Sequence, residues 1–113
     1  MLLDTAVIDD VRETLGDDVY RGFAARMLSE VAETTGTLRD LLAKGDLETL
    51  AKAAHRTSGS AAGIGAKGLH ALLKDIENAC RGPAASSSVP ALVATLPIRA
   101  EETRTALDAH LSG

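Results

Sequence analysis

The sequence predicts an all-α fold, in which an antiparallel four-helix bundle carries an additional short helix at the N-terminus. Two observations lead to this prediction. Of the 113 residues, 45% are hydrophobic but only 2% are aromatic, so the core must consist of Leu, Val and Ala in segments that favour helix. Apolar residues also recur three and four positions apart in successive stretches, which is the spacing of one helical face. Such helices joined by short loops pack as a bundle, and we expect residues 1–113 to form one domain.

The first helix is expected to be short. Its apolar residues recur between Leu3 and Leu15, and Asp4 or Thr5 stands where an N-cap is needed. Gly16 ends this helix, because glycine readily adopts backbone conformations that close a helix.

A long helix should follow. Asp17 and Asp18 offer it an N-cap and place negative charge at the positive end of its dipole. The pattern continues to Lys44, which corresponds to about 25 residues, and we expect Gly36 to be tolerated within a continuous helix. The predicted buried face consists of Tyr20, Phe23, Met27, Val31, Leu38 and Leu41.

Gly45 can end the long helix and Asp46 can cap the next one, so the sequence predicts a third helix here. His55 lies about 100° around this helix from Ala54. It therefore falls at the edge of the buried face, and we expect it to be exposed. The predicted buried face consists of Leu47, Leu50, Ala54 and Ala61.

Two further helices complete the predicted bundle. Gly63 and Gly65 precede a helix that ends at Gly82-Pro83, and the small, polar residues 84–88 are typical of a connector. The last helix passes through Pro97, and we expect one kinked helix there. The inward-facing residues are Leu69, Leu72, Leu73, Ile76 and Cys80 in the fourth helix and Leu92, Leu96, Ala100, Thr103, Leu107 and Leu111 in the fifth.

Charge and composition argue against several kinds of partner. A net charge of −4 disfavours nucleic acid, which would require a clustered basic face. The single cysteine, Cys80, excludes an internal disulfide and fits a reducing compartment. No apolar run approaches the roughly 20 residues of a membrane span, and residues 1–4 lack the basic start of a secretory signal. We therefore expect no membrane partner, a cytoplasmic location and a monomer.

The segment from Ala54 to Ala66 places one histidine among small residues. Because its neighbours one turn away are small, another protein's backbone can approach the imidazole closely. The segment resembles the signature of histidine-containing phosphotransfer (HPt) domains, although Ser58 stands where that family has a lysine. The matching residues are His55, Gly59, Ser60, Gly65 and Ala66, and Leu15-Gly16-Asp17-Asp18 and Gly45-Asp46 resemble the turns upstream of the family's active helix.

This resemblance implies a phosphorelay intermediary. His55 would accept a phosphoryl group from a receiver-domain aspartate or a hybrid histidine kinase, and would pass it to the receiver aspartate of a response regulator. A neutral imidazole suits this task, since its unperturbed pKa of about 6.5 leaves one ring nitrogen free at neutral pH. The partner receivers would bring magnesium, so the chain would need no cofactor or metal of its own. It would be a phosphocarrier without ATP-dependent kinase activity.

Residues around His55 are candidates for stabilising the phosphoryl group or docking the partner. Lys52 and Arg56 would supply positive charge, although Lys52 can instead form a surface pair with Glu48. Ser58 could donate a hydrogen bond to phosphate or could bond only its own backbone. The small side chains of Gly59 and Ala62 would let a partner approach His55 closely.

Glu77 is a candidate from the fourth helix. If the third and fourth helices are antiparallel, it falls where the family often has a polar residue that bonds the imidazole. Its carboxylate could orient the ring, but it would also repel a phosphoryl group.

A purely structural function is the alternative. The chain would then be a non-phosphorylated helical adaptor that docks receiver domains or partner helices. His70 and His110 show no spacing to His55 or Cys80 that would assemble a metal site. Gly63 and Gly65 lack the strand and the further glycines of a nucleotide-binding loop.

Overall fold

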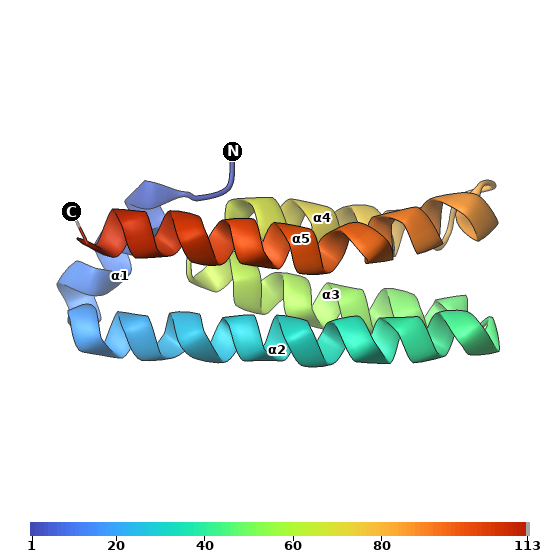
Figure 1. The fold of residues 1–113 in the computed structure, drawn as a ribbon, viewed down its shortest axis with the longest axis horizontal. Helices are drawn as coiled ribbons and strands as arrows, with labels where there is room; N and C mark the ends of the chain where they lie inside the picture. Colours follow the sequence, from blue (N-terminus) through green and yellow to red (C-terminus); the bar gives the residue numbers. More distant parts are fainter. Residues whose placement is uncertain (113) are drawn as a thin grey trace.

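The structure, a computed structural model, describes residues 1–112 and is an all-helical bundle. Figure 1 shows the four longer helices side by side, with successive helices antiparallel, while the short N-terminal helix lies at one end of the bundle. No strand occurs in the described part of the chain, and the predicted fold class is confirmed. Gly113, the last residue of the predicted domain, lies outside the described residues. The helices are α1 (Thr5–Leu15), α2 (Asp17–Lys44), α3 (Leu47–Gly63), α4 (Lys67–Ala79) and α5 (Ala85–Ser112).

Buried side chains from every helix form one hydrophobic cluster along the bundle axis. Most of them are Leu, Val or Ala residues, as the composition predicts, and Leu50 and Leu69 are fully buried. Phe23 is a correction, because 38% of it is exposed and the Arg26 guanidinium lies over its ring. Ala24 takes the buried place instead, since it follows Tyr20 by about one turn on the side that faces the core.

Two of the predicted helix caps are present. The Asp4 carboxylate accepts a hydrogen bond from the Val7 amide at 3.2 Å, and Asp46 accepts from the Thr49 amide at 3.1 Å. Each bond satisfies one amide that the first turn of a helix leaves without a partner. These caps start α1 and α3 at the residues that the sequence indicates.

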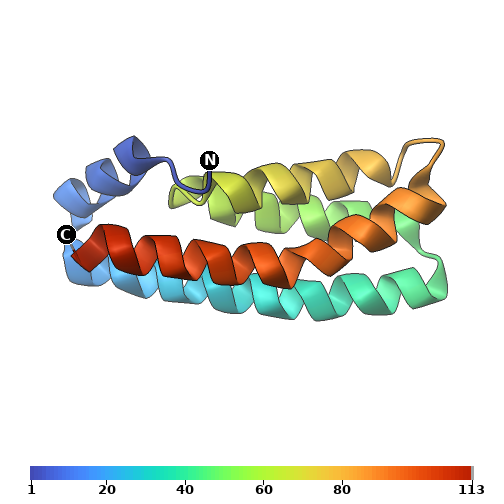
Figure 2. The same ribbon diagram turned by 45° about the horizontal axis from the view of Figure 1, so that its top comes forward.

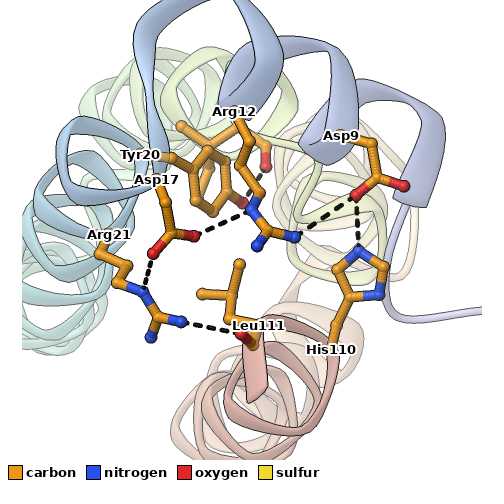
Figure 3. A network of polar contacts seen from close by, with 8 residues as sticks. Asp9, Arg12, Asp17, Tyr20, Arg21, His110 and Leu111 are labelled. Atoms are coloured by element: carbon orange, nitrogen blue, oxygen red, sulfur yellow. Dashed lines mark hydrogen bonds and ion pairs between the residues drawn. The ribbon is translucent and has the colours of Figure 1, made fainter. Parts of the chain in front are cut away.

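The predicted cap of α2 was wrong. Asp17 is already the first helical residue, and its carboxylate accepts hydrogen bonds from Arg12 at 2.9 Å and from Arg21 at 2.6 Å. These guanidinium groups, Arg21 first, lower the pKa of Asp17. Arg21 also donates to the carbonyl of Leu111 at 2.8 Å, so the network shown in Figure 3 joins α1, α2 and the end of α5.

The last helix begins earlier than predicted. Residues 84–88 were expected to form a connector, but α5 starts at Ala85 because Ala85 and Val89 extend its buried face. The helix continues through Pro97, as predicted, although proline cannot donate a backbone hydrogen bond to the preceding turn. Figure 2 shows that the N-terminal part of α5, in orange, bends relative to the rest of the helix.

The loop between α3 and α4 is fastened from two sides. The Tyr20 hydroxyl donates to the Ile64 carbonyl at 2.6 Å, and burial raises the pKa of Tyr20 to about 12. The Asp4 amide donates to the Gly65 carbonyl at 2.8 Å. Gly65 has φ +82°, and a Cβ there would lie 2.8 Å from both the Asp4 carbonyl oxygen and an Ile8 side-chain carbon. Only glycine satisfies this conformation and this close approach.

Candidate functional site

His55 projects from the middle of α3, with 64% of its side chain exposed. The opposite side of the helix is fixed in the core, where Leu50, Ala54 and Ala61 are fully buried. The exposed position of His55 follows from its place about 100° around from Ala54. The α3 residues that are exposed with it include Lys52, Arg56, Gly59 and Ala62.

Small residues form the surface of α3 beside the His55 imidazole. A Cβ built on Gly59 would meet nothing within 4 Å, so no packing inside the protein requires glycine at this position. Ala62 is exposed as well, one turn further along. These two small residues therefore leave the approach to His55 open, rather than allowing another helix to pack closely.

The imidazole is held from the neighbouring helix α4. His55 Nδ1 lies 3.1 Å from Glu77 Oε1, so the antiparallel packing of α3 and α4 brings together residues that are far apart in sequence. The Glu77 side chain is only 10% exposed. A carboxylate that is nearly buried and hydrogen-bonded restricts the orientation of the ring.

Two cations flank the same carboxylate. Lys74 Nζ donates to Glu77 Oε1 at 2.9 Å, and Arg81 Nη1 donates to Oε2 at 3.3 Å. The hydrogen bonds from Lys74, from His55 and from Arg81 lower the pKa of Glu77 to about 2, although its burial acts in the opposite direction. Lys74 and Arg81 are not among the site residues predicted from the sequence. Their positions three residues before and four residues after Glu77 were the available signal.

This chain matches a known protein family over most of its length. The family model described as Hpt domain matches residues 23–112, which include His55 and all of its contacts described above. The chain belongs to the Hpt domain family. Members of this family generally take part in histidine phosphotransfer in phosphorelays and interact with response-regulator receivers. No match was found among the curated proteins or the solved structures that were searched.

Ser58, where the sequence comparison above expected a lysine, points away from the surface of this Hpt domain. Its residue exposure is 3%, and its hydroxyl donates to the His55 backbone carbonyl at 2.6 Å. Of the two sequence-based interpretations, bonding to its own backbone is the one observed. The hydroxyl is not directed at the space in which a phosphoryl group on His55 would lie.

Lys52 and Arg56 remain on the exposed side of the Hpt domain's α3. Lys52 lies 3.6 Å from Glu48, and both side chains are more than 70% exposed, which matches the predicted surface pair. Arg56 forms no ion pair with any described residue. The two cations also line a shallow hollow between α3 and α2.

The rest of the Hpt domain shows neither a metal site nor a membrane segment in the residues described. No group of three or more His, Cys, Asp or Glu side chains in residues 1–112 could hold a metal ion. His70 is half-buried, with Nδ1 3.0 Å from the Ser58 carbonyl oxygen. None of the described helices is long and apolar enough to cross a membrane.

Proposed function

We propose that this Hpt domain accepts a phosphoryl group on His55 from a receiver-domain aspartate, either free or within a hybrid histidine kinase. It then passes the group to the receiver aspartate of a response regulator. The observation that carries this proposal is the combination of an exposed imidazole with a carboxylate fixed at its Nδ1, 3.1 Å away. The carboxylate alone would not distinguish His55, because His110 Nε2 lies 2.8 Å from Asp9, but the His110 side chain is only 26% exposed.

The hydrogen bond to Glu77 defines which ring nitrogen reacts. An ionised carboxylate can only accept hydrogen bonds, so Nδ1 of His55 carries the proton. The lone pair is then on Nε2, which is the nucleophile. Nε2 forms a bond to phosphorus as the bond between phosphorus and the aspartate oxygen breaks, and the electron pair returns to the aspartate carboxylate. The proton stays on Nδ1, where Glu77 faces the positive charge that the ring acquires.

The partner supplies the remaining chemistry. Magnesium is expected in the receiver's site, where it would neutralise charge on the phosphoryl oxygens. This Hpt domain contributes the nucleophile and the low surface around Gly59 and Ala62, over which a receiver can bring its aspartate to Nε2. Transfer in the opposite direction uses the same geometry.

Labelling of His55 tests the proposal. Receiver domains charged with acetyl phosphate should transfer acid-labile phosphate to the wild-type chain and to His110→Gln, but not to His55→Gln. His55 is exposed, so its replacement by glutamine should leave the helical circular dichroism and the melting temperature nearly unchanged. Equal labelling of folded His55→Gln would place the acceptor elsewhere.

The alternative, a non-phosphorylated adaptor, predicts a different result. Receivers would bind the chain, and binding would survive in His55→Gln, but no receiver in the panel would label the wild-type protein. Isothermal titration calorimetry on the same receivers separates these outcomes.

A further inference from the structure

Glu77 presents an electrostatic problem for the proposed reaction. A carboxylate beside an imidazole favours the imidazolium form, in which Nε2 has no lone pair. It also repels an incoming phosphoryl group, which carries a charge of about −1.5 to −2. Ser58, about one turn after His55, is buried and supplies no positive charge to this site.

Lys74 can offset both effects of the Glu77 carboxylate, because it contacts the oxygen of Glu77 that faces His55. Its ammonium donates to Glu77 Oε1 at 2.9 Å, and this is the same oxygen that accepts the hydrogen bond from His55 Nδ1 at 3.1 Å. We infer that Lys74 is a positioning residue for phosphotransfer, which supplies from α4 the positive charge that allows a carboxylate to hold the reactive imidazole. This inference rests on the proposed phosphorylation of His55.

The other charged groups near His55 are less well placed for this role. Arg81 is bound to the second oxygen of Glu77 at a longer distance, 3.3 Å, and its side chain is 63% exposed, against 38% for Lys74. Screening by water weakens the more exposed contact. On α2, Glu30 accepts a hydrogen bond from Ser60. The charged residues next to His55 along α3 are Lys52 and Arg56, and those bound to its partner Glu77 on α4 are Lys74 and Arg81.

An ordinary surface ion pair would not have this geometry. Lysine and glutamate three residues apart on a helix often pair without consequence. Here the glutamate side chain is 10% exposed and its oxygen is shared with the proposed nucleophile. A change in the charge of Lys74 must therefore reach His55 through Glu77.

The test compares transfer rates over pH for five variants, each with the same phosphorylated receiver. Lys74→Met should slow transfer to His55 by about three- to tenfold and should move the pH of half-maximal transfer upward, because Glu77 then favours the imidazolium. Lys74→Arg should restore most of the rate. When Glu77 is already replaced by glutamine, loss of the Lys74 charge should have no effect. The double variant Lys74→Met/Glu77→Gln should therefore transfer at the same rate as Glu77→Gln alone. Lys44→Met, which removes an exposed lysine at the end of α2, should match the wild type.

Three results would overturn the inference. One is a pH profile of Lys74→Met that coincides with that of Lys44→Met. Another is a slow Lys74→Met variant that neither Lys74→Arg nor Glu77→Gln rescues while its circular dichroism is native. The third is an unchanged NMR titration of the Glu77 carboxyl group after Lys74→Met. Absence of label on the wild-type chain would instead contradict the proposed function, so the two failures are distinguishable.

Discussion

Glu77 shows how one residue can be both ionised and nearly buried. Three donors from three side chains, Lys74, His55 and Arg81, converge on its carboxylate. They compensate for the loss of solvation that burial imposes on a charged group. The hydrogen bond that orients the imidazole therefore remains available throughout the neutral pH range.

The titration of Glu77 gives the first prediction at this scale. Its pKa is lowered from 4.5 to about 2, with the Lys74 hydrogen bond as the largest cause. A lowered pKa in the folded state means that these contacts stabilise the fold above pH 4.5 and lose their effect as the pH falls towards 2. The carboxyl carbon signal of Glu77 should thus stay at its ionised position down to about pH 3 in an NMR titration. A midpoint near 4.5 would contradict the arrangement.

Gly65 gives a second prediction, about backbone conformation. Gly65→Ala should destabilise the protein by about 1–3 kcal/mol or more, because φ is positive and the new Cβ would meet the Asp4 carbonyl oxygen and Ile8. Gly36→Ala is the matched control, since Gly36 lies within α2 with open space around it. That control should stabilise by about 0.5–1 kcal/mol. Urea unfolding measures both, and equal effects would show that Gly65 has no special conformational task.

At the scale of the element, α3 combines two functions along a single helix. One face anchors it in the bundle through fully buried residues such as Leu50 and Ala54. The other face exposes His55, and a Cβ added at Gly59 on this face would meet no atom within 4 Å. Because these faces are independent, the residues around His55 can be altered without disturbing the core.

Gly59→Leu tests this independence. The bulky side chain should obstruct a receiver's approach and lower the transfer rate to His55, while the helix gains about 0.5–1 kcal/mol of propensity. Gly36→Leu is the control, because it places the same side chain at an open glycine on a different helix. Transfer kinetics and melting temperatures should be recorded for both. If Gly59→Leu is as stable as the control and transfers at the normal rate, receivers do not dock over the exposed side of α3 at Gly59.

At the scale of the whole molecule, the site depends on the packing of α3 against α4. His55 and Glu77 are 22 residues apart in sequence, and the shared hydrophobic cluster, together with the contact of His70 with the Ser58 carbonyl, keeps their helices in register. Aromatic residues contribute little to this cluster, so its cohesion comes from many aliphatic contacts. Loss of one such side chain affects the entire bundle.

Leu50→Ala should therefore lower the free energy of unfolding by about 2–5 kcal/mol, the usual cost of a cavity in a packed core. Leu50 is fully buried, whereas Ile98 is 62% exposed and serves as the control. Ile98→Ala should change stability by no more than about 0.5 kcal/mol. Chemical denaturation of both variants checks this, and similar values would show that the core was misassigned.

Much of the fold could be predicted from the sequence, because its signals are local. The Asp4 and Asp46 carboxylates cap helices by accepting hydrogen bonds from amides three residues further along. Gly16 and Gly45 end helices through their own positive φ angles. Periodicity then determined which residues share a face. The exposed position of His55 follows from these local rules alone, and so does its spacing to the small residues of the HPt signature.

The tertiary structure decided what happens at the edges of those faces. Phe23 was predicted to be buried and Ala24 was not, but the position of the neighbouring helices exposes Phe23 and covers Ala24. Ser58 likewise became buried through packing, which turned its hydroxyl to the backbone. Most of all, the shared Glu77 oxygen depends on two helices meeting in one register, since a contact between distant segments arises from packing and not from spacing along either segment.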